Sequence, residues 1–183
     1  CGGKPDPADR PVDPPARING AKVAAAKRDT TEAFCDQYAP DDRGAAFHWP
    51  KLAGATAPAP TGAHWRWVNL WATWCGPCVE EMPRILAWRD RLAQAGRPVE
   101  LTFVSVDEND AAIADFRKDH PATPPSVRVA SVAERTAWLA ALHLDDGAIP
   151  IQLFVSPAGH LRCARAGGLR DKDYDVVAKL LAE

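Results

Sequence analysis

The sequence predicts an α/β domain in which a central mixed β-sheet is flanked by helices and preceded by an N-terminal extension. Three observations support this class. Short apolar segments rich in branched and aromatic residues alternate with segments of helical periodicity over residues 64–183. Two consecutive strands near the C-terminus are joined by a tight Ala-Gly turn, which makes them antiparallel. The other strands are joined through helices, the connection that parallel strands need.

Length and composition indicate one domain with an appendage. A chain of 183 residues can bury a sizeable core, and its net charge of -2 gives no reason to expect nucleic acid as a partner. No run of about 18 apolar residues occurs. We expect residues 1–20 to form a disordered, proline-rich tether and residues 21–183 to form the folded domain, with an N-terminal elaboration over about 21–62.

The first half of the chain is expected to supply the central strand and the helix that follows it. Residues 64–73 are dense in tryptophan and branched residues, so they predict a buried, central strand. The segment 76–95 predicts a helix because its apolar residues recur on one face, and Gly96 suits the position just past its end. Upstream, we expect a helix over 21–39 and a short strand over 45–54 that a proline interrupts.

The second half of the chain is expected to complete the sheet and its covering helices. An apolar run predicts a second buried strand at 99–107, and the helical segment after it is stopped by Pro121. Asp171 is a candidate N-cap for the terminal helix. The remaining elements are a helix at 109–120, a short strand at 126–130, a helix at 132–144, hairpin strands at 149–157 and 160–167, and a helix at 171–182.

Cys75 and Cys78 form a Cys-x-x-Cys pair at a strand-to-helix junction. Unpaired backbone N–H groups and the helix dipole favour negative charge on the first sulfur, and the thiolate is the attacking form in disulfide exchange. A zinc site is the alternative, but it normally needs four ligands, and the chain has no second such pair. His160 and Cys163 lie three apart on an expected strand and point to opposite faces, so we expect no metal site.

The segment WCGPC (74–78) resembles the active site of thioredoxin-fold thiol–disulfide oxidoreductases. The continuation VEEMP (79–83) is similar to the TlpA/ResA-type branch, whose members are membrane-anchored extracytoplasmic proteins. The resemblance implies a thioredoxin fold in which Cys75 is the nucleophile and Cys78 the resolving thiol, with no cofactor besides the redox-active Cys75–Cys78 disulfide. It also implies that Trp74, Gly76 and Pro77 border the reactive sulfur and contact substrates.

Glu81 matches the glutamate that this branch carries after the motif. It follows Cys78 by three residues, so a partly desolvated carboxyl there can exchange a proton with the Cys78 thiol. The alternative is a solvated helix glutamate. Cytoplasmic thioredoxins carry a buried aspartate six residues before the first cysteine, and this chain has Asn69. An amide cannot carry the proton, which again points to Glu81.

The segment GAIPIQ (147–152) resembles the cis-proline segment that thioredoxin folds place opposite the cysteine pair. The resemblance implies a cis Ile149–Pro150 bond. The backbone of Ile149 would then be free to pair with an extended substrate segment.

Three cysteines remain outside the pair. Two of them, Cys35 and Cys163, are expected to form a structural disulfide, which some TlpA-like proteins have in a similar place; two unrelated buried thiols are the alternative. Cys1 and the glycine- and proline-rich stretch after it resemble a processed bacterial lipoprotein, in which this cysteine carries the lipid. The alternative is an arbitrary start of the chain. The lipoprotein reading implies a periplasmic or other extracytoplasmic location on a bacterial membrane.

The resemblance implies a monomeric reductase of substrate protein disulfides. Its Gly-Pro dipeptide is that of thioredoxin, whose potential is about -270 mV, against about -120 mV for the oxidant DsbA. Implied substrates are apocytochrome c or copper-delivery proteins, and the implied electron donor is a membrane-embedded thiol–disulfide reductase. A disulfide oxidase or isomerase and a non-catalytic binding module remain as alternatives. A peroxidase is disfavoured because Ala72 stands where peroxiredoxins need threonine.

Overall fold

The computed structural model describes residues 30–59, 62, 64–144 and 147–183. The expected tether (1–20), the candidate lipidation site Cys1 and the first part of the expected N-terminal helix (21–29) lie outside the described residues.

A six-stranded mixed sheet forms the centre of the domain, in the order β1-β6-β5-β2-β3-β4. Strands β2, β3 and β4 run parallel, whereas β5 lies antiparallel to β2, β6 to β5 and β1 to β6. This confirms the predicted mixed sheet with a C-terminal hairpin. The strands are β1 (Gln37–Tyr38), β2 (Trp65–Trp71), β3 (Val99–Ser105), β4 (Ser126–Arg128), β5 (Ile151–Val155) and β6 (Leu161–Ala166).

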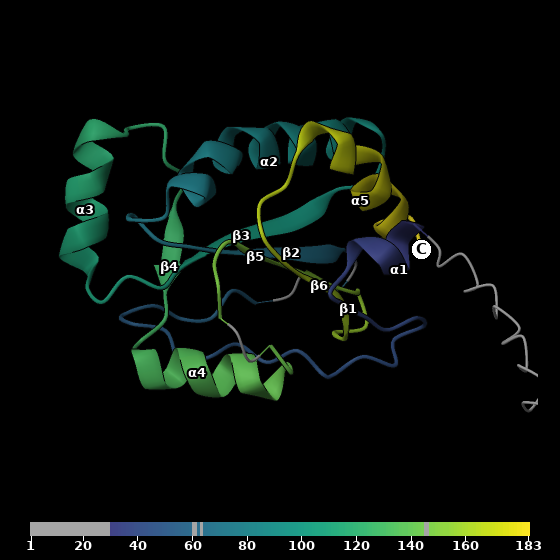
Figure 1. Ribbon diagram of the computed structural model, residues 1–183, viewed down its shortest axis with the longest axis horizontal. Helices are drawn as coiled ribbons and strands as arrows, with labels where there is room; N and C mark the ends of the chain where they lie inside the picture. Colours follow the sequence, from purple (N-terminus) through teal and green to yellow (C-terminus); the bar gives the residue numbers. More distant parts are fainter. Residues whose placement is uncertain (1–29, 60–61, 63, 145–146) are drawn as a thin grey trace, which may run out of the picture.

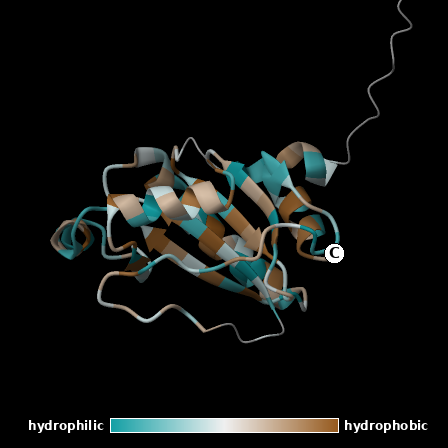
Figure 2. Ribbon diagram, turned by 90° about the horizontal axis from the view of Figure 1, so that it is seen from below, coloured by the Kyte–Doolittle hydropathy of each residue, from teal (hydrophilic) through white to brown (hydrophobic). Residues whose placement is uncertain are grey.

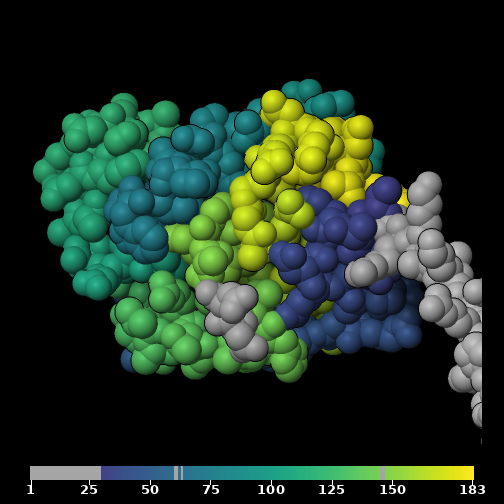
Figure 3. All heavy atoms as spheres, viewed as in Figure 1, coloured from purple at the N-terminus to yellow at the C-terminus, as the bar shows by residue number. Residues whose placement is uncertain are grey.

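Helices cover both faces of this sheet. Figure 1 shows α2 and α5 above the sheet, α4 below it and α3 beside β4, while α1 packs against α5 (Figures 1 and 3). None of the helices within the described ranges is long and apolar enough to cross a bilayer. The helices are α1 (Thr30–Phe34), α2 (Gly76–Gln94), α3 (Asp110–Asp119), α4 (Val132–Ala141) and α5 (Tyr174–Leu180), the last preceded by the 3-10 turn η1 (Asp171–Asp173).

Strand β2 is the middle of the hydrophobic core. Trp67, Val68, Leu70 and Trp71 are completely buried, and Figure 2 shows hydrophobic residues concentrated along the strands. Because helices lie on both faces, side chains of both pleat directions must be apolar, which explains the near-continuous apolar run. Strand β3 is buried only over Phe103–Ser105. These residues are the ones that pair with β4, so the first half of β3 has no strand partner on that side within the described residues.

Residues 36–53, here called the strap, run along the sheet from one edge to the other. At the β6 side, Asp36 N donates to Ala164 O and Phe47 N donates to Gly159 O (2.9 and 2.8 Å). At the β4 side, Ala53 N donates to the Arg128 carbonyl at 2.8 Å. Strand pairing within 45–54 is limited to isolated bridges at Ala46 and Leu52, so the strand expected there is wrong.

Two further expectations differ from the structure. The helix expected over 21–39 ends at Phe34, because Gln37–Tyr38 pairs with β6 and sheet pairing overrides the local helical pattern. Asp171 does not cap the terminal helix. Its carboxylate binds Arg84 Nε at 2.6 Å, and Asp173 instead accepts from the backbone N–H of Arg170 at 2.8 Å.

Candidate active site

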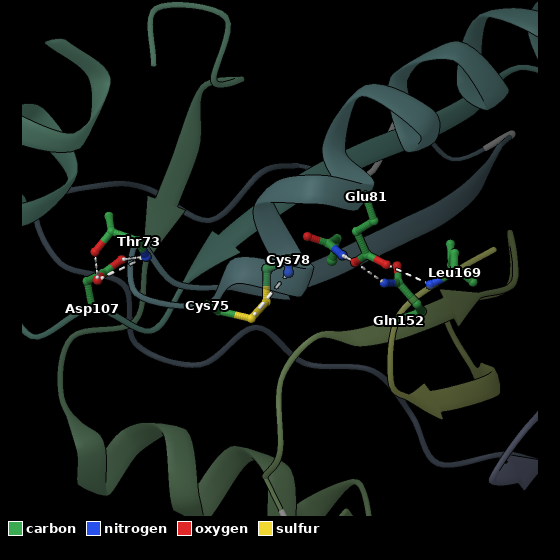
Figure 4. The surroundings of a disulfide bond; sticks show 8 residues. Thr73, Cys75, Cys78, Glu81, Asp107, Gln152 and Leu169 are labelled. Atoms are coloured by element: carbon green, nitrogen blue, oxygen red, sulfur yellow. Dashed lines mark hydrogen bonds between the residues drawn. A yellow bond between two sulfur atoms is a disulfide. The ribbon is translucent and has the colours of Figure 1, made fainter. Parts of the chain in front are cut away.

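The cysteine pair lies where β2 passes into α2. Cys75 is the N-cap residue of that helix, and its Sγ accepts a hydrogen bond from the backbone N–H of Cys78 at 3.3 Å. The two sulfurs form a disulfide with a Cα–Cα separation of 5.3 Å (Figure 4). Pro77 occupies the first turn, where no backbone N–H is needed. In the reduced state, a thiolate on Cys75 would face the unpaired N–H groups and positive dipole end of a long helix.

The surface around Cys75 is made by its sequence neighbours. Trp74 is 68% exposed, whereas Cys75 itself is 6% exposed and Cys78 is completely buried. Gly76 and Pro77 are also exposed. The three residues expected to meet a substrate therefore form an accessible rim, and the first sulfur is the one closer to solvent.

A buried carboxylate fixes the loop that leads into the pair. Asp107 accepts hydrogen bonds from the backbone N–H of Thr73 at 3.1 and 3.2 Å and from its hydroxyl at 2.7 Å. The hydroxyl of Ser105 donates to the same carboxylate at 2.7 Å. Figure 4 shows Thr73 and Asp107 together on one side of the disulfide. This contact was not predicted from the sequence, in which the acidic Asp107 at the end of an apolar segment is the signal for it.

The Ile149–Pro150 peptide bond is cis. Leu70 pairs with Ile151, so the start of β5 lies beside the C-terminal end of β2. The cysteine pair follows this same end of β2. The carbonyl of Pro150 accepts a hydrogen bond from Gly167 N at 2.8 Å. Ile149 is half-buried there and Pro150 is buried.

Glu81 is buried rather than solvated, with 1% of its surface exposed. Its Oε1 accepts from Asn69 Nδ2 at 2.8 Å and from Gln152 Nε2 at 2.7 Å, and its Oε2 accepts from Leu169 N at 2.7 Å (Figure 4). Burial raises the pKa of the Glu81 carboxyl above its ordinary value, and these three hydrogen bonds together with Arg84 oppose that rise only in part. A carboxyl with a raised pKa holds its proton to higher pH than an exposed glutamate does, which suits it to exchanging a proton with a neighbouring group.

Glu81 and Cys78 lie three residues apart on α2, so they face the same side of the helix, and both are buried. Gln152 and the backbone of Leu169 were not predicted from the sequence as partners of Glu81. Gln152 is polar within an otherwise apolar strand, a signal that was available. The backbone contact from Leu169 has no signal in the sequence.

Cys35 and Cys163 form a second disulfide, with a Cα–Cα separation of 5.5 Å. Cys163 is completely buried in β6, two strands away from β2, and pairs in register with Tyr38 of the strap. This bridge joins the segment between α1 and β1 to the sheet. It lies in β6 and the segment before β1, away from the Cys75–Cys78 pair at the start of α2.

Comparisons with known proteins give the fold. No family model matches the chain. A thioredoxin-related protein from Neisseria meningitidis serogroup B is 29% identical over 72% of this chain and 98% of its own, with a TM-score of 0.55. The chain has the thioredoxin fold. A thioredoxin domain of a thiol-disulfide oxidoreductase from Bacteroides vulgatus is similar in fold, with a TM-score of 0.52 at 18% identity, covering 66% of this chain and 81% of that chain.

Two curated relatives match shorter segments of this thioredoxin-fold chain. The thiol-disulfide oxidoreductase ResA of Bacillus thuringiensis subsp. konkukian is 36% identical over 53 residues, which is 29% of this chain and 30% of that protein. The thioredoxin-like protein YneN of Bacillus subtilis is 31% identical over 58 residues, which is 32% of this chain and 34% of that protein. The chain thus matches about a third of the length of these relatives.

Proposed function

We propose that the protein is a thiol–disulfide oxidoreductase that works by dithiol exchange at Cys75 and Cys78. The observation that supports this most directly is the Cys75–Cys78 disulfide at the N-terminus of α2, with an exposed rim and a cis-proline at the same edge of the sheet. The similarity to a protein named as a thiol-disulfide oxidoreductase supports the same activity.

The exchange proceeds in two displacements. The Cys75 thiolate attacks one sulfur of a substrate disulfide, which forms a mixed disulfide and releases the other substrate sulfur as a thiolate. The Cys78 thiolate then attacks Cys75 Sγ, which closes the Cys75–Cys78 disulfide and releases the second substrate thiolate. The substrate gains two electrons and takes up two protons, and the enzyme dithiol is oxidised. Glu81 accepts the proton that Cys78 must lose before the second displacement.

We propose the reducing direction, because the Gly-Pro dipeptide between the cysteines matches that of the reductant thioredoxin. A membrane-embedded thiol–disulfide reductase would return the active pair to the dithiol. Substrates would be disulfide-bonded proteins such as apocytochrome c or copper-delivery proteins.

We further propose a monomer held at the extracytoplasmic side of a bacterial membrane by lipid on Cys1. The buried Cys35–Cys163 bridge supports this location, since structural disulfides persist in oxidising compartments. Mass spectrometry of the protein from membranes, with and without lipase treatment, tests the anchor.

Reduction of insulin by dithiothreitol, followed by turbidity, tests the activity. We expect the wild-type protein to accelerate precipitation and the Cys75→Ser variant to be inactive. Equal rates for the two proteins would contradict the enzyme assignment and leave a binding module. A measured potential of the active pair above about -150 mV would instead favour an oxidase or isomerase over a reductase.

A further inference from the structure

Two side-chain amides contact the same oxygen of Glu81, but they differ in their freedom to turn. The amide of Gln152 is fixed at both ends, because its Oε1 accepts from Trp67 Nε1 at 2.8 Å while its Nε2 donates to Glu81 Oε1. The amide of Asn69 is fixed at one end only. Its Nδ2 donates to Glu81 Oε1, whereas its Oδ1 is buried and has no hydrogen-bond partner among the described residues.

This arrangement suits an ionised carboxylate. An ionised oxygen only accepts, and Oε1 accepts from both amides. A protonated Oε1 has one hydrogen to donate and can still accept, so it can keep the bond from Gln152 Nε2. Its new hydrogen would, however, face the Nδ2–H of Asn69, and two donors cannot form a hydrogen bond. Rotation of Gln152 would break its bond to Trp67, while rotation of Asn69 breaks no bond at Oδ1. A hydrogen on Oε2 would find no acceptor in its printed contact, because the group that faces Oε2 is the backbone N–H of Leu169, a donor that cannot turn; Asn69 Oδ1 beside Oε1 is an acceptor without a partner among the described residues.

We propose that Asn69 is a positioning residue that turns its side-chain amide by half a rotation when Glu81 takes up a proton. In the turned state, Asn69 Oδ1 accepts a hydrogen bond from protonated Oε1, and Gln152 keeps donating to the same oxygen. Glu81 then has three hydrogen bonds in both protonation states. The use of this turn in catalysis rests on the proposed dithiol exchange, because it would let Glu81 take the Cys78 proton without losing a bond. The turn itself requires only the titration of Glu81.

The charged surroundings of Glu81 are simple. The residues that face it from β2, from β5 and from the loop after β6 are uncharged: Asn69, Gln152 and Leu169. The charged group that acts on it is Arg84 from its own helix. Cys78, three residues before Glu81 on the same helix, is held in a disulfide in the oxidised protein. Titration of the oxidised protein therefore isolates Glu81 from the cysteines.

Nuclear magnetic resonance of the oxidised wild-type protein tests the turn without any substrate. The Glu81 carboxyl carbon gives the midpoint of its titration, and side-chain amide and indole signals report the partners. We expect the Asn69 amide protons to shift strongly at that midpoint as they leave Oε1, while the amide protons of Gln152 and the indole N–H of Trp67 move much less. Equal shifts for the two amides, or no shift at Asn69, would overturn the proposal.

A pair of volume-matched variants gives a second readout. Gln152→Met removes a donor whose bond weakens strongly when Oε1 becomes a neutral hydroxyl oxygen, so we expect the ratio of ionised to protonated Glu81 at fixed pH to fall about tenfold. Asn69→Leu removes a donor to the ionised oxygen and also, in the turned state, the acceptor of the carboxyl O–H, so its effects on the two forms largely offset each other and we expect a change of about threefold or less. A fall as large in Asn69→Leu as in Gln152→Met would identify Asn69 as a fixed donor. Because insulin reduction is measured separately, failure of the turn and failure of the proposed activity remain distinguishable.

Discussion

Removal of the Cys35–Cys163 bridge should destabilise the protein far more than removal of the active pair. The two bridged residues are 128 positions apart in sequence. In the chain-entropy model, a loop of this length lowers the entropy of the unfolded chain enough to stabilise the folded state by about 5 kcal/mol. The active pair closes a loop with a separation of only 3, for which the same model gives about 2 kcal/mol.

The two double variants Cys35→Ala/Cys163→Ala and Cys75→Ala/Cys78→Ala provide a matched comparison. Urea denaturation followed by tryptophan fluorescence gives the free energy of unfolding for each, with a check that the m-value is consistent with two-state behaviour. We expect the first variant to lose about 3 kcal/mol more than the second. The second variant should lose insulin reduction and the first should retain it. Losses that agree within about 1 kcal/mol would refute the loop-length reasoning.

Three further perturbations follow from single contacts. Burial raises the pKa of Glu81 above its ordinary value of 4.5, so between the two pKa values the folded protein binds more protons than the unfolded chain. The stability that the protonated Glu81 contributes is therefore complete below pH 4.5 and is lost as the pH rises through the raised pKa. Glu81→Gln should flatten that part of the stability curve in urea denaturations at a series of pH values; an unchanged slope would contradict the assignment. Asp107→Ala should lower the free energy of unfolding by about 1–3 kcal/mol and slow insulin reduction, because it leaves the N–H and hydroxyl of Thr73 without their acceptor. Gly44→Ala should cost about 1–3 kcal/mol by thermal or urea denaturation, because the new Cβ would lie 1.8 Å from the Leu161 carbonyl oxygen; wild-type stability would show that the strap moves aside freely.

The sequence predicted the parts of the fold that local patterns determine. The apolar run of β2, the periodicity of α2 with Gly96 after its end, and the Ala-Gly turn of the hairpin are all features of consecutive residues. The strap was not predicted: its residues were expected to form the end of a helix and a short strand, whereas their hydrogen bonds run to the two sides of the sheet, which lie far away in the sequence. Here tertiary pairing outweighs local preference.

The candidate site also has parts that the sequence predicts and parts that it does not. The cysteine pair, Glu81 and Pro150 belong to motifs that can be read along the chain. The partners of Glu81 come from three separate elements, and one of them is a backbone N–H, for which any residue type serves. The spacing of residues along one segment cannot reveal contacts between separate elements. The glutamine in the apolar strand β5 does indicate that this strand makes a buried polar contact.

The strap also limits where another polypeptide can pair with the edges of this sheet. An open strand edge pairs with any extended chain that reaches it, whether or not that chain carries a disulfide. At the β4 edge, backbone groups of Lys51 and Ala53 already hold Ala130 and Arg128, and on the far side of β6 the sheet ends in a strand of only two residues. The strap therefore leaves an extended partner of the proposed oxidoreductase fewer places to pair with the sheet away from the end of β2 and β5 beside Cys75.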